Sequence, residues 1–421
     1  MTKSIIYWLL GIALTLGAPI LETGPSFVTF LSLQSAALLV LAGFALLSRD
    51  TWRARTMILG IVFLIYVSVT SIATVLLYQY PPQFSAWVLC VFLVWVLVFV
   101  HLSLTSSVLR SELLSGVLVG GWINIGVIFI NLSGENFLAY WSAMINVERA
   151  GPWAHYFSAD TAVYSIHGAI GLFSFSRTAS GYFFAILYLL TILKSKENSR
   201  MFLFASTMYA AAIGLTGSKL GFVLFTLFFA ILAFRFFQRR PATAIVFGPV
   251  FVAIGACVLF YMVSPEFLGR IFGISDDGYG AFLEGRLERQ AYILDLDPWE
   301  YVFGVGAGNL SFRTGTDALG YRLYGLHNAV LQYVANIGIV GTILYTVFVA
   351  SLVKFWGGWR LVFLISALVS SVGDDFLFPS TQGSAIPVIL ILAILWTSKK
   401  EELAQAGPLP KQRMSSAAAR E

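Results

Sequence analysis

Charged residues are scarce in this chain. Only 11% of its 421 residues are Asp, Glu, Lys or Arg, and 58% are hydrophobic. A soluble domain is about one quarter charged and about half apolar, so this balance excludes an ordinary soluble domain and indicates a polytopic membrane protein. The net charge of +5 does not indicate a nucleic-acid partner, because the positions of the basic residues matter more than their small excess.

Cysteine is almost absent as well. Cys90 and Cys257 both lie in apolar runs, so neither a disulfide framework nor a thiolate metal site is indicated. The glycine-rich stretch 304–308 lacks the lysine and the preceding strand that a nucleotide-binding loop requires. Nucleotide binding is therefore excluded as an interpretation of these glycines.

Long apolar runs make up most of the chain. A membrane span needs about 17–25 mostly apolar residues. By this criterion the sequence predicts twelve spans, an all-α bundle, at Ile5–Ile20, Phe27–Leu47, Thr56–Tyr78, Phe84–Leu104, Leu113–Asn131, Gly181–Leu193, Met201–Leu215, Leu220–Phe237, Ala242–Val263, Asn328–Leu352, Phe355–Val372 and Gln382–Trp396. The first run follows Lys3 without an obvious cleavage site, which favours a retained span over a signal peptide.

The basic residues predict the orientation of these spans. Cytoplasmic connections are enriched in Lys and Arg, and an even number of spans places both termini on the same side. With both termini in the cytoplasm, Lys219 is the only basic residue in a short outer connection. The inner segments then carry Lys3, Arg49, Arg53, Arg55, Arg110, Lys194, Lys196, Arg200, Arg235, Arg239, Arg240, Lys354, Arg360 and the tail from Lys399.

This topology predicts one polytopic domain, residues 1–398, with two large outer loops at about 132–180 and 264–327. The tail, residues 399–421, is rich in Ala, Ser, Lys and Glu and is predicted to be disordered and cytoplasmic. Both outer loops carry arginines, although the positive-inside bias disfavours them there. Long loops are translocated regardless of charge, so these arginines are compatible with the predicted topology. The topology does not explain why they are there.

The candidate functional residues lie mostly in or beside the second loop, between Glu284 and Gly341. Arginine presents a planar fork of donors that suits phosphate oxygens. Arg286 and Arg289 share one face if their segment is helical; pairing with Glu284 and Glu288 is the alternative. Arg322 is a further loop cation, and His327 begins a predicted span, where it could accept a proton from an attacking hydroxyl or cap the helix.

Three further candidates flank other spans. Arg177 precedes the sixth span, where it could instead anchor the helix at the interface. Lys219 begins the eighth, where a bound anion would offset an otherwise unfavourable cation at a helix N-terminus. Asp374 ends the eleventh span on the outer side, where an acidic residue is either functional or part of a hydrated helix end.

Four segments resemble a known family. They are GLFSFSRTASGYFFAILYLL, GLTGSKLGFVLFTLFF, GRLERQAYILD followed by VFGVGAGN, and HNAVLQYVANIGIVG. In this order, between Gly171 and Gly341, they resemble the bacterial O-antigen polymerase and O-antigen ligase superfamily. The resemblance implies a helical inner-membrane glycosyltransferase without cofactor or metal, with site residues Arg177, Lys219, Arg286 and His327. Lys219 stands where the family usually has arginine.

The resemblance also implies the substrates. An undecaprenyl-diphosphate-linked glycan would be the donor, a lipid-linked sugar the acceptor, and membrane lipid the surroundings; a chain-length regulator and a flippase stay open as protein partners. We expect a polysaccharide polymerase acting at the periplasmic face, with ligation of the glycan to lipid A core as the alternative. A flippase or transporter is disfavoured because such carriers usually bury ionisable residues near the bilayer centre, and the predicted spans contain almost none away from their ends. A structural scaffold would leave the outer arginines unexplained.

Overall fold

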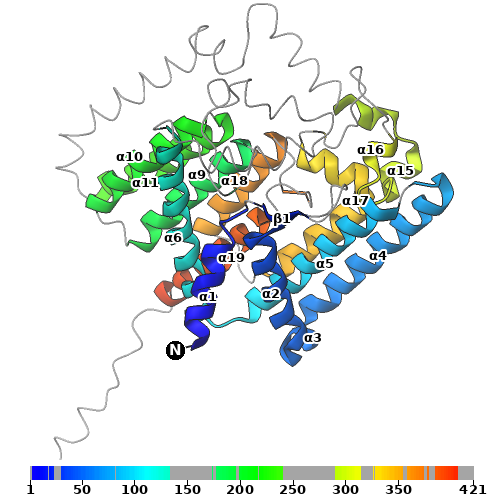
Figure 1. Ribbon diagram of the computed structural model, residues 1–421, viewed down its shortest axis with the longest axis horizontal. Coiled ribbons are helices and arrows are strands. Elements are labelled where there is room, and N and C mark those ends of the chain that lie inside the picture. The colour runs from blue at the N-terminus through cyan, green and yellow to red at the C-terminus, as the bar shows by residue number, and fades with distance from the viewer. Residues whose placement is uncertain are drawn as a thin grey trace, which may run out of the picture.

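Figure 1 shows the computed structural model of the chain as a bundle of helices. The structure describes residues 2–17, 19–22, 30–80, 82–132, 173, 177–195, 199–216, 218–239, 290–313, 326, 328–353, 358–373, 377–378 and 385–405. The longer helices of the described part are α1 (Thr2–Ala13), α2 (Leu33–Leu47), α4 (Arg55–Tyr78), α5 (Pro82–Leu104), α6 (Ser107–Leu132), α9 (Arg177–Lys194), α10 (Ser199–Thr216), α11 (Lys219–Arg239), α17 (Ala329–Ser351), α18 (Trp359–Gly373) and α19 (Ile386–Gln405).

Each predicted span that the structure describes contains a helix; Ala242–Val263 lies outside the described residues. Within the described ranges, four helical segments are long and apolar enough to cross a membrane: Arg55–Tyr78, Ser85–Leu104, Ser107–Ile130 and Ala329–Ser351. Shorter apolar segments lie within α1, α2, α9, α11, α18 and α19. The helical class is therefore confirmed, whereas the number of crossings and their orientation stay predictions.

The N-terminal region departs from the predicted spans. Helix α1 ends at Ala13, not at Ile20, and an antiparallel hairpin of β1 (Pro19–Glu22) and β2 (Phe30–Ser32) follows it. Pro19 cannot donate a helical hydrogen bond, so α1 could not have continued regularly to Ile20. Helix α2 starts only at Leu33, because Ser32 caps it by accepting a hydrogen bond from the Ser35 N–H at 3.1 Å.

The exposed face of helix α4 has the apolar character of a surface that contacts lipid. Its exposed face is a stripe of large aliphatic residues, and its polar residues Ser71 and Thr74 lie on the buried face. A helix in water has the opposite pattern, with its polar side chains outward. The exposed stripe is Ile58, Val62, Ile65, Val69, Ile72 and Leu76, and the buried face includes Gly60, Ser71 and Thr74.

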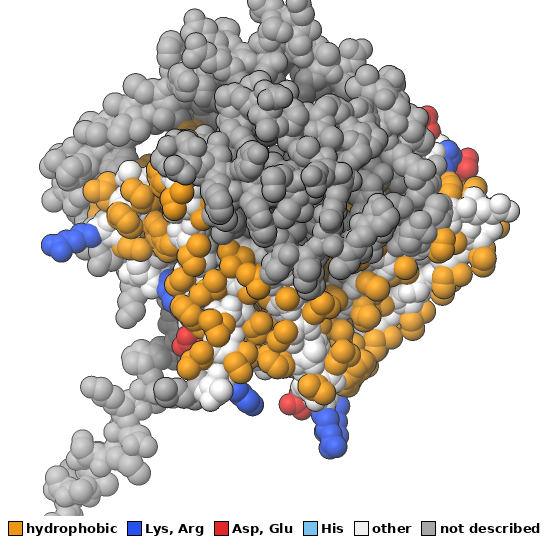
Figure 2. Space-filling model, viewed as in Figure 1, with side chains coloured by type: hydrophobic (Ala, Val, Ile, Leu, Met, Phe, Trp, Pro, Cys, Tyr) orange, Lys and Arg blue, Asp and Glu red, His pale blue; other side chains and the backbone are white. Residues whose placement is uncertain are grey.

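Figure 2 shows the same property over a whole flank of the molecule, where hydrophobic side chains dominate and charged ones lie at the margins. The described part of the chain thus has the surface of a helical membrane protein. Inside the bundle, a cluster of aromatic rings forms part of the core. Phe92 lies in this cluster and contacts Phe63, Trp95, Tyr333, Tyr345 and Phe378.

Two segments that the sequence predicted to be irregular, the tail and the second outer loop, contain helix. Helix α19 continues to Gln405, so residues 399–405 prolong the last helix where the sequence predicted disorder; Lys, Glu, Leu, Ala and Gln are all good helix formers. Residues 406–421 lie outside the described residues. Part of the second predicted loop is also regular: a 3-10 turn η2 (Tyr292–Asp295), α15 (Pro298–Phe303) and α16 (Leu310–Arg313) pack at the end of α4 and α17 (Figure 1).

Candidate functional site

Most of the predicted site residues lie outside the described residues. These are the catalytic candidates Arg286 and His327 and the secondary candidates Arg289, Arg322, Glu284 and Asp374. The structure describes the backbone of Arg177 and Lys219, which are the first residues of α9 and α11. The site is therefore built from those two helix starts and from the residues that flank the other candidates.

The first turns of α9 and α11 touch. A Cβ built on Gly221 would lie 2.6 Å from the Cα of Gly181, and one built on Gly181 would lie 2.1 Å from the Oγ of Ser218. Further along the two helices, the rings of Tyr188 and Phe225 pack at 4.7 Å, so the helices run in the same direction. The backbones of Arg177 and Lys219 therefore start from the same end of the helix pair.

This shared end concentrates positive potential. Unpaired N–H groups and the aligned peptide dipoles make a helix N-terminus favourable for anions, and here two such termini lie side by side. Ser218 is buried and accepts a hydrogen bond from the Gly221 N–H at 3.1 Å, which satisfies one of the free donors of α11. The other donors of the first turn are left for a cap, solvent or a ligand.

Helix α18 connects this end to the start of α17. The hydroxyl of Tyr182, in α9, lies 3.5 Å from that of Ser366, in α18. Beyond the end of α18, the carbonyl of Leu377 accepts a hydrogen bond from the Tyr333 hydroxyl at 2.8 Å. Leu377, which follows α18, is thus attached to the N-terminal part of α17.

Both chain neighbours of His327 are held in place. The N–H of Leu326 donates to the Oε1 of Gln332 at 2.9 Å, and Leu326 is buried. Asn328 is the N-cap of α17 and accepts a hydrogen bond from the Leu331 N–H at 3.1 Å. The backbone on either side of the predicted catalytic histidine is therefore fixed by the helix that follows it.

Helix α17 is broken at Gly338, where the sequence predicted one continuous span. Gly338 has φ 71° and ψ 173°, a conformation that glycine adopts without strain. A Cβ there would lie 2.2 Å from the carbonyl oxygen of Val302. Near the break, the carbonyl of Ala335 accepts from the Val305 N–H at 2.9 Å and that of Ile337 from the Tyr66 hydroxyl at 3.3 Å. Irregular backbone within a span requires such partners.

The glycine-rich turn 304–308 fits against this break. Gly304 has φ 83° and Gly306 has φ 89°, and a Cβ on either would clash with α17 or α4. The clash distances are 2.5 Å to the Asn336 carbonyl oxygen for Gly304 and 2.1 Å to the Thr74 Oγ1 for Gly306. These glycines allow the turn to pack closely against the bundle, and this packing accounts for their presence.

Buried amide and hydroxyl side chains join the turn to three helices. Asn309 is fully buried; it accepts from Ser85 at 2.8 Å and donates to Thr74 at 3.2 Å. The N–H of Ala307 donates to Ser71, and that of Gly308 to Asn336, each at 3.0 Å. Sequence reasoning missed this network; the helical spacing of Ser71 with Thr74, and of Gln332 with Asn336, was a readable signal.

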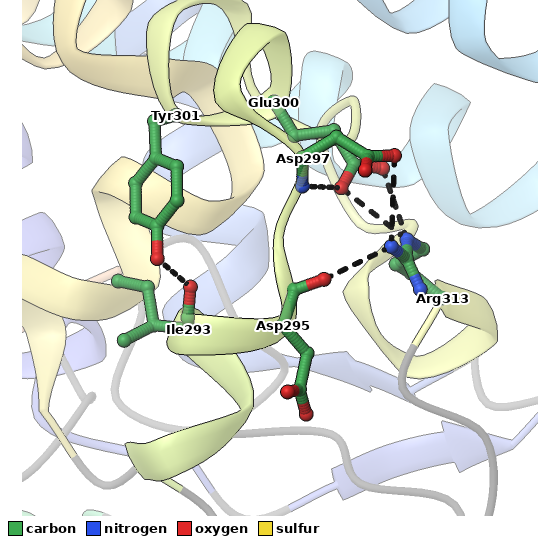
Figure 3. Close-up of polar contacts among 6 residues, drawn as sticks. All are labelled: Ile293, Asp295, Asp297, Glu300, Tyr301 and Arg313. Atoms are coloured by element: carbon green, nitrogen blue, oxygen red, sulfur yellow. Dashed lines mark hydrogen bonds and ion pairs between the residues drawn. The ribbon is translucent and has the colours of Figure 1, made fainter.

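An ion pair between Glu300 and Arg313 joins two parts of the loop segment 290–313 (Figure 3). The carboxylate of Glu300 is buried and accepts from the Nε of Arg313 at 3.0 and 3.3 Å, while the guanidinium also donates to the Asp295 carbonyl at 3.1 Å. Hydrogen bonding to Glu300 raises the pKa of Arg313. Arg313 belongs to the second predicted outer loop, and the structure places it in this ion pair.

Within the described residues, no group of three or more His, Cys, Asp or Glu side chains is arranged to hold a metal ion. In comparisons with known proteins, no family model matched the chain, and no curated protein matched it. The function is therefore inferred from the residues and their arrangement.

Proposed function

We propose that this protein is a membrane glycosyltransferase of the O-antigen polymerase and ligase type, acting on glycans carried by a polyprenyl diphosphate. Twelve spans with both termini in the cytoplasm would place the starts of α9, α11 and α17 at the periplasmic face of a bacterial inner membrane. At that face Arg177, Lys219 and Arg286 would bind the diphosphate. Polymerisation onto a lipid-linked repeat unit is our first choice.

The observation that supports this proposal most is the contact between the first turns of α9 and α11. Gly181 and Gly221 bring together two helix N-termini that begin with basic residues. An anion is stabilised by such an end, and a diphosphate carries enough charge and oxygen atoms to interact with both. A diphosphate bound at this end would interact with both helix N-termini and with both basic residues.

The proposed reaction exchanges one C–O bond for another. The hydroxyl oxygen of the acceptor sugar bonds to the anomeric carbon of the donor while the bond from that carbon to the diphosphate oxygen breaks. The hydroxyl proton passes to His327 or to a loop carboxylate such as Glu284. Negative charge develops on the departing diphosphate, where cations and helix N-termini stabilise it most effectively.

Reconstitution into liposomes with a synthetic polyprenyl-diphosphate oligosaccharide tests the proposal. A ladder of products is expected for a polymerase. A single addition to supplied lipid A core would indicate the ligase alternative, and movement of the substrate across the bilayer without new bonds would indicate a flippase and overturn the proposal.

Variants in the predicted site give the second test. Arg286→Ala and His327→Ala should abolish product while the protein still inserts and folds. Arg53→Ala is a matched control, because Arg53 is an exposed arginine on the short helix α3 (Arg49–Arg53), near the opposite end of α4. Full transfer in both site variants would show that the site lies elsewhere.

A further inference from the structure

Three aromatic rings stack where α4 meets the loop segment 290–313. Tyr78 is the last residue of α4, Tyr80 follows it closely, and Trp299 belongs to α15. The ring centroids of Tyr78 and Trp299 are 5.9 Å apart with an interplanar angle of 6°, and those of Tyr78 and Tyr80 are 5.4 Å apart with an angle of 17°. We call Tyr78, Tyr80 and Trp299 the aromatic stack.

The aromatic stack remains partly open to the surroundings. Tyr78 is 40% exposed, and Tyr80 and Trp299 are half-buried. By contrast, the core rings of Phe63, Phe92 and Trp95 are fully buried. The stack also lies directly beyond Leu76, the last residue of the lipid-facing stripe on α4. It therefore sits at the C-terminal end of α4, a helix long and apolar enough to cross a membrane.

Charged groups border the aromatic stack. Asp297, two residues before Trp299, has a side chain that is 57% exposed, and it pairs at 3.8 Å with Arg313, whose side chain is 30% exposed. Burial raises the pKa of the Tyr80 hydroxyl, with Arg313 opposing that shift and Glu300 adding to it. Carboxylate acceptors and guanidinium donors thus lie beside flat apolar surfaces.

This combination suits a sugar ring. The C–H face of a pyranose is apolar and packs on an aromatic face, while its hydroxyls need donors and acceptors at the edge of the ring. Aromatic residues also gather at membrane interfaces as anchors. The mutual stacking of the three rings, together with an exposed carboxylate beside them, favours recognition of a ligand that is flat, apolar on one face and rich in hydroxyls.

We propose that the aromatic stack is a binding platform for the glycan of a lipid-linked sugar, with Asp297 and Arg313 hydrogen-bonding its hydroxyls. This inference rests on the proposed function for the origin of the glycan. Helix α15, which carries Trp299, packs against α17, so a glycan held on the stack would lie on the loop segment that contacts α17. Tyr78, Tyr80 and Trp299 would then select the acceptor and leave the chemical step to other residues.

The experiment uses the full chain in lipid nanodiscs and a panel of water-soluble oligosaccharides of hexoses and N-acetylhexosamines, without lipid or diphosphate. Saturation-transfer NMR measures binding to the wild type, Trp299→Ala, Trp299→Phe and Phe303→Ala. Phe303 is the matched control, an aromatic residue that is 47% exposed at the other end of α15. Trp299→Ala should weaken binding up to about tenfold, whereas Trp299→Phe and Phe303→Ala should change it little.

Two results would overturn the platform. One is a wild type that binds no member of the panel. The other is an equal effect of Trp299→Ala and Phe303→Ala, which would show that the rings only anchor the protein at the interface. Because this binding measurement requires no transfer, it is independent of the reconstitution test. If oligosaccharide binding depends on Trp299 but the protein shows no transferase activity, the binding platform is supported and the proposed function is contradicted.

Discussion

The backbone N–H of Gly308 donates a hydrogen bond to the side chain of Asn336 at 3.0 Å. This contact joins the glycine-rich turn to α17 just before the break at Gly338. The same asparagine donates to the Gln332 carbonyl at 2.8 Å, and the Gln332 side chain accepts from the Leu326 N–H. A continuous set of hydrogen bonds therefore leads from the loop to the residue before His327, so the loop and the start of α17 should behave as one unit.

Substitution of Gly338 tests whether the break is required. Gly338→Ala should destabilise the protein by more than about 2 kcal/mol, because the residue has positive φ and its Cβ would overlap the Val302 carbonyl. Gly214→Ala is the control: Gly214 lies in α10 with no atom within 4 Å of its built Cβ, and alanine favours a helix. The thermal unfolding midpoint in detergent measures both variants. Equal midpoints would contradict a required break.

The Glu300–Arg313 pair should hold the loop segment. Arg313→Ala leaves a buried carboxylate without its partner and should cost about 1–3 kcal/mol, a value reduced because the guanidinium is partly exposed to solvent. Glu300→Gln in the same background removes the buried charge and should recover part of the loss. Limited proteolysis of the loop and thermal unfolding provide the readouts, with Arg53→Ala as the control. If the double variant were no better than Arg313→Ala, the charge would not be the cause.

The contact between α9 and α11 predicts a specific rescue. Gly181→Ala should separate the first turns, because the new Cβ would lie 2.1 Å from the Ser218 Oγ. Ser218→Gly removes that obstacle and costs a helix cap only a few tenths of a kcal/mol, so the double variant should regain stability and transfer activity. Gly221→Ala meets the backbone of Gly181 at 2.6 Å and should resist any rescue by Ser218→Gly. Rescue of both variants alike would argue against this packing.

The start of α17 should control the chemical step. Gln332→Met keeps most of the side-chain volume and removes the acceptor for the Leu326 N–H. Displacement of a catalytic group by about 1 Å can cost about 100-fold in rate, so kcat should fall by about 10–100-fold while KM for the donor stays near its wild-type value. Val330→Ala, at an exposed position of the same turn, should change neither constant. A change in donor KM alone would contradict a positioning role for Gln332.

The sequence predicts the helices of this fold because long apolar runs are strong signals. The hairpin β1–β2 was missed, since β2 lies within a predicted span and β1 overlaps the end of another. The break at Gly338 depends on packing against Val302, which no local pattern reveals. The start of α15 could have been predicted from the sequence, because Asp297 and Glu300 form a capping box and Pro298 is the first helical residue.

Only part of the candidate site could be predicted from the sequence. Basic residues next to predicted spans indicated Arg177 and Lys219, but the meeting of their helices depends on Gly181 and Gly221, which come together only in the folded bundle. The pairing of Arg313 with Glu300 likewise required tertiary structure. Charge patterns identify which arginines are unusual for a membrane protein, and packing decides which of them are occupied by a carboxylate.

A double-mutant cycle on Arg177 and Lys219 tests the diphosphate site most directly. The measurement is the dissociation constant of a synthetic polyprenyl diphosphate for the purified protein with Arg177→Ala, Lys219→Ala and both, with Arg200→Ala at the start of α10 as the control. If both cations bind one diphosphate, each single variant should weaken binding, and the two effects should be coupled by at least about 0.5 kcal/mol. Wild-type affinity in both single variants would contradict the site.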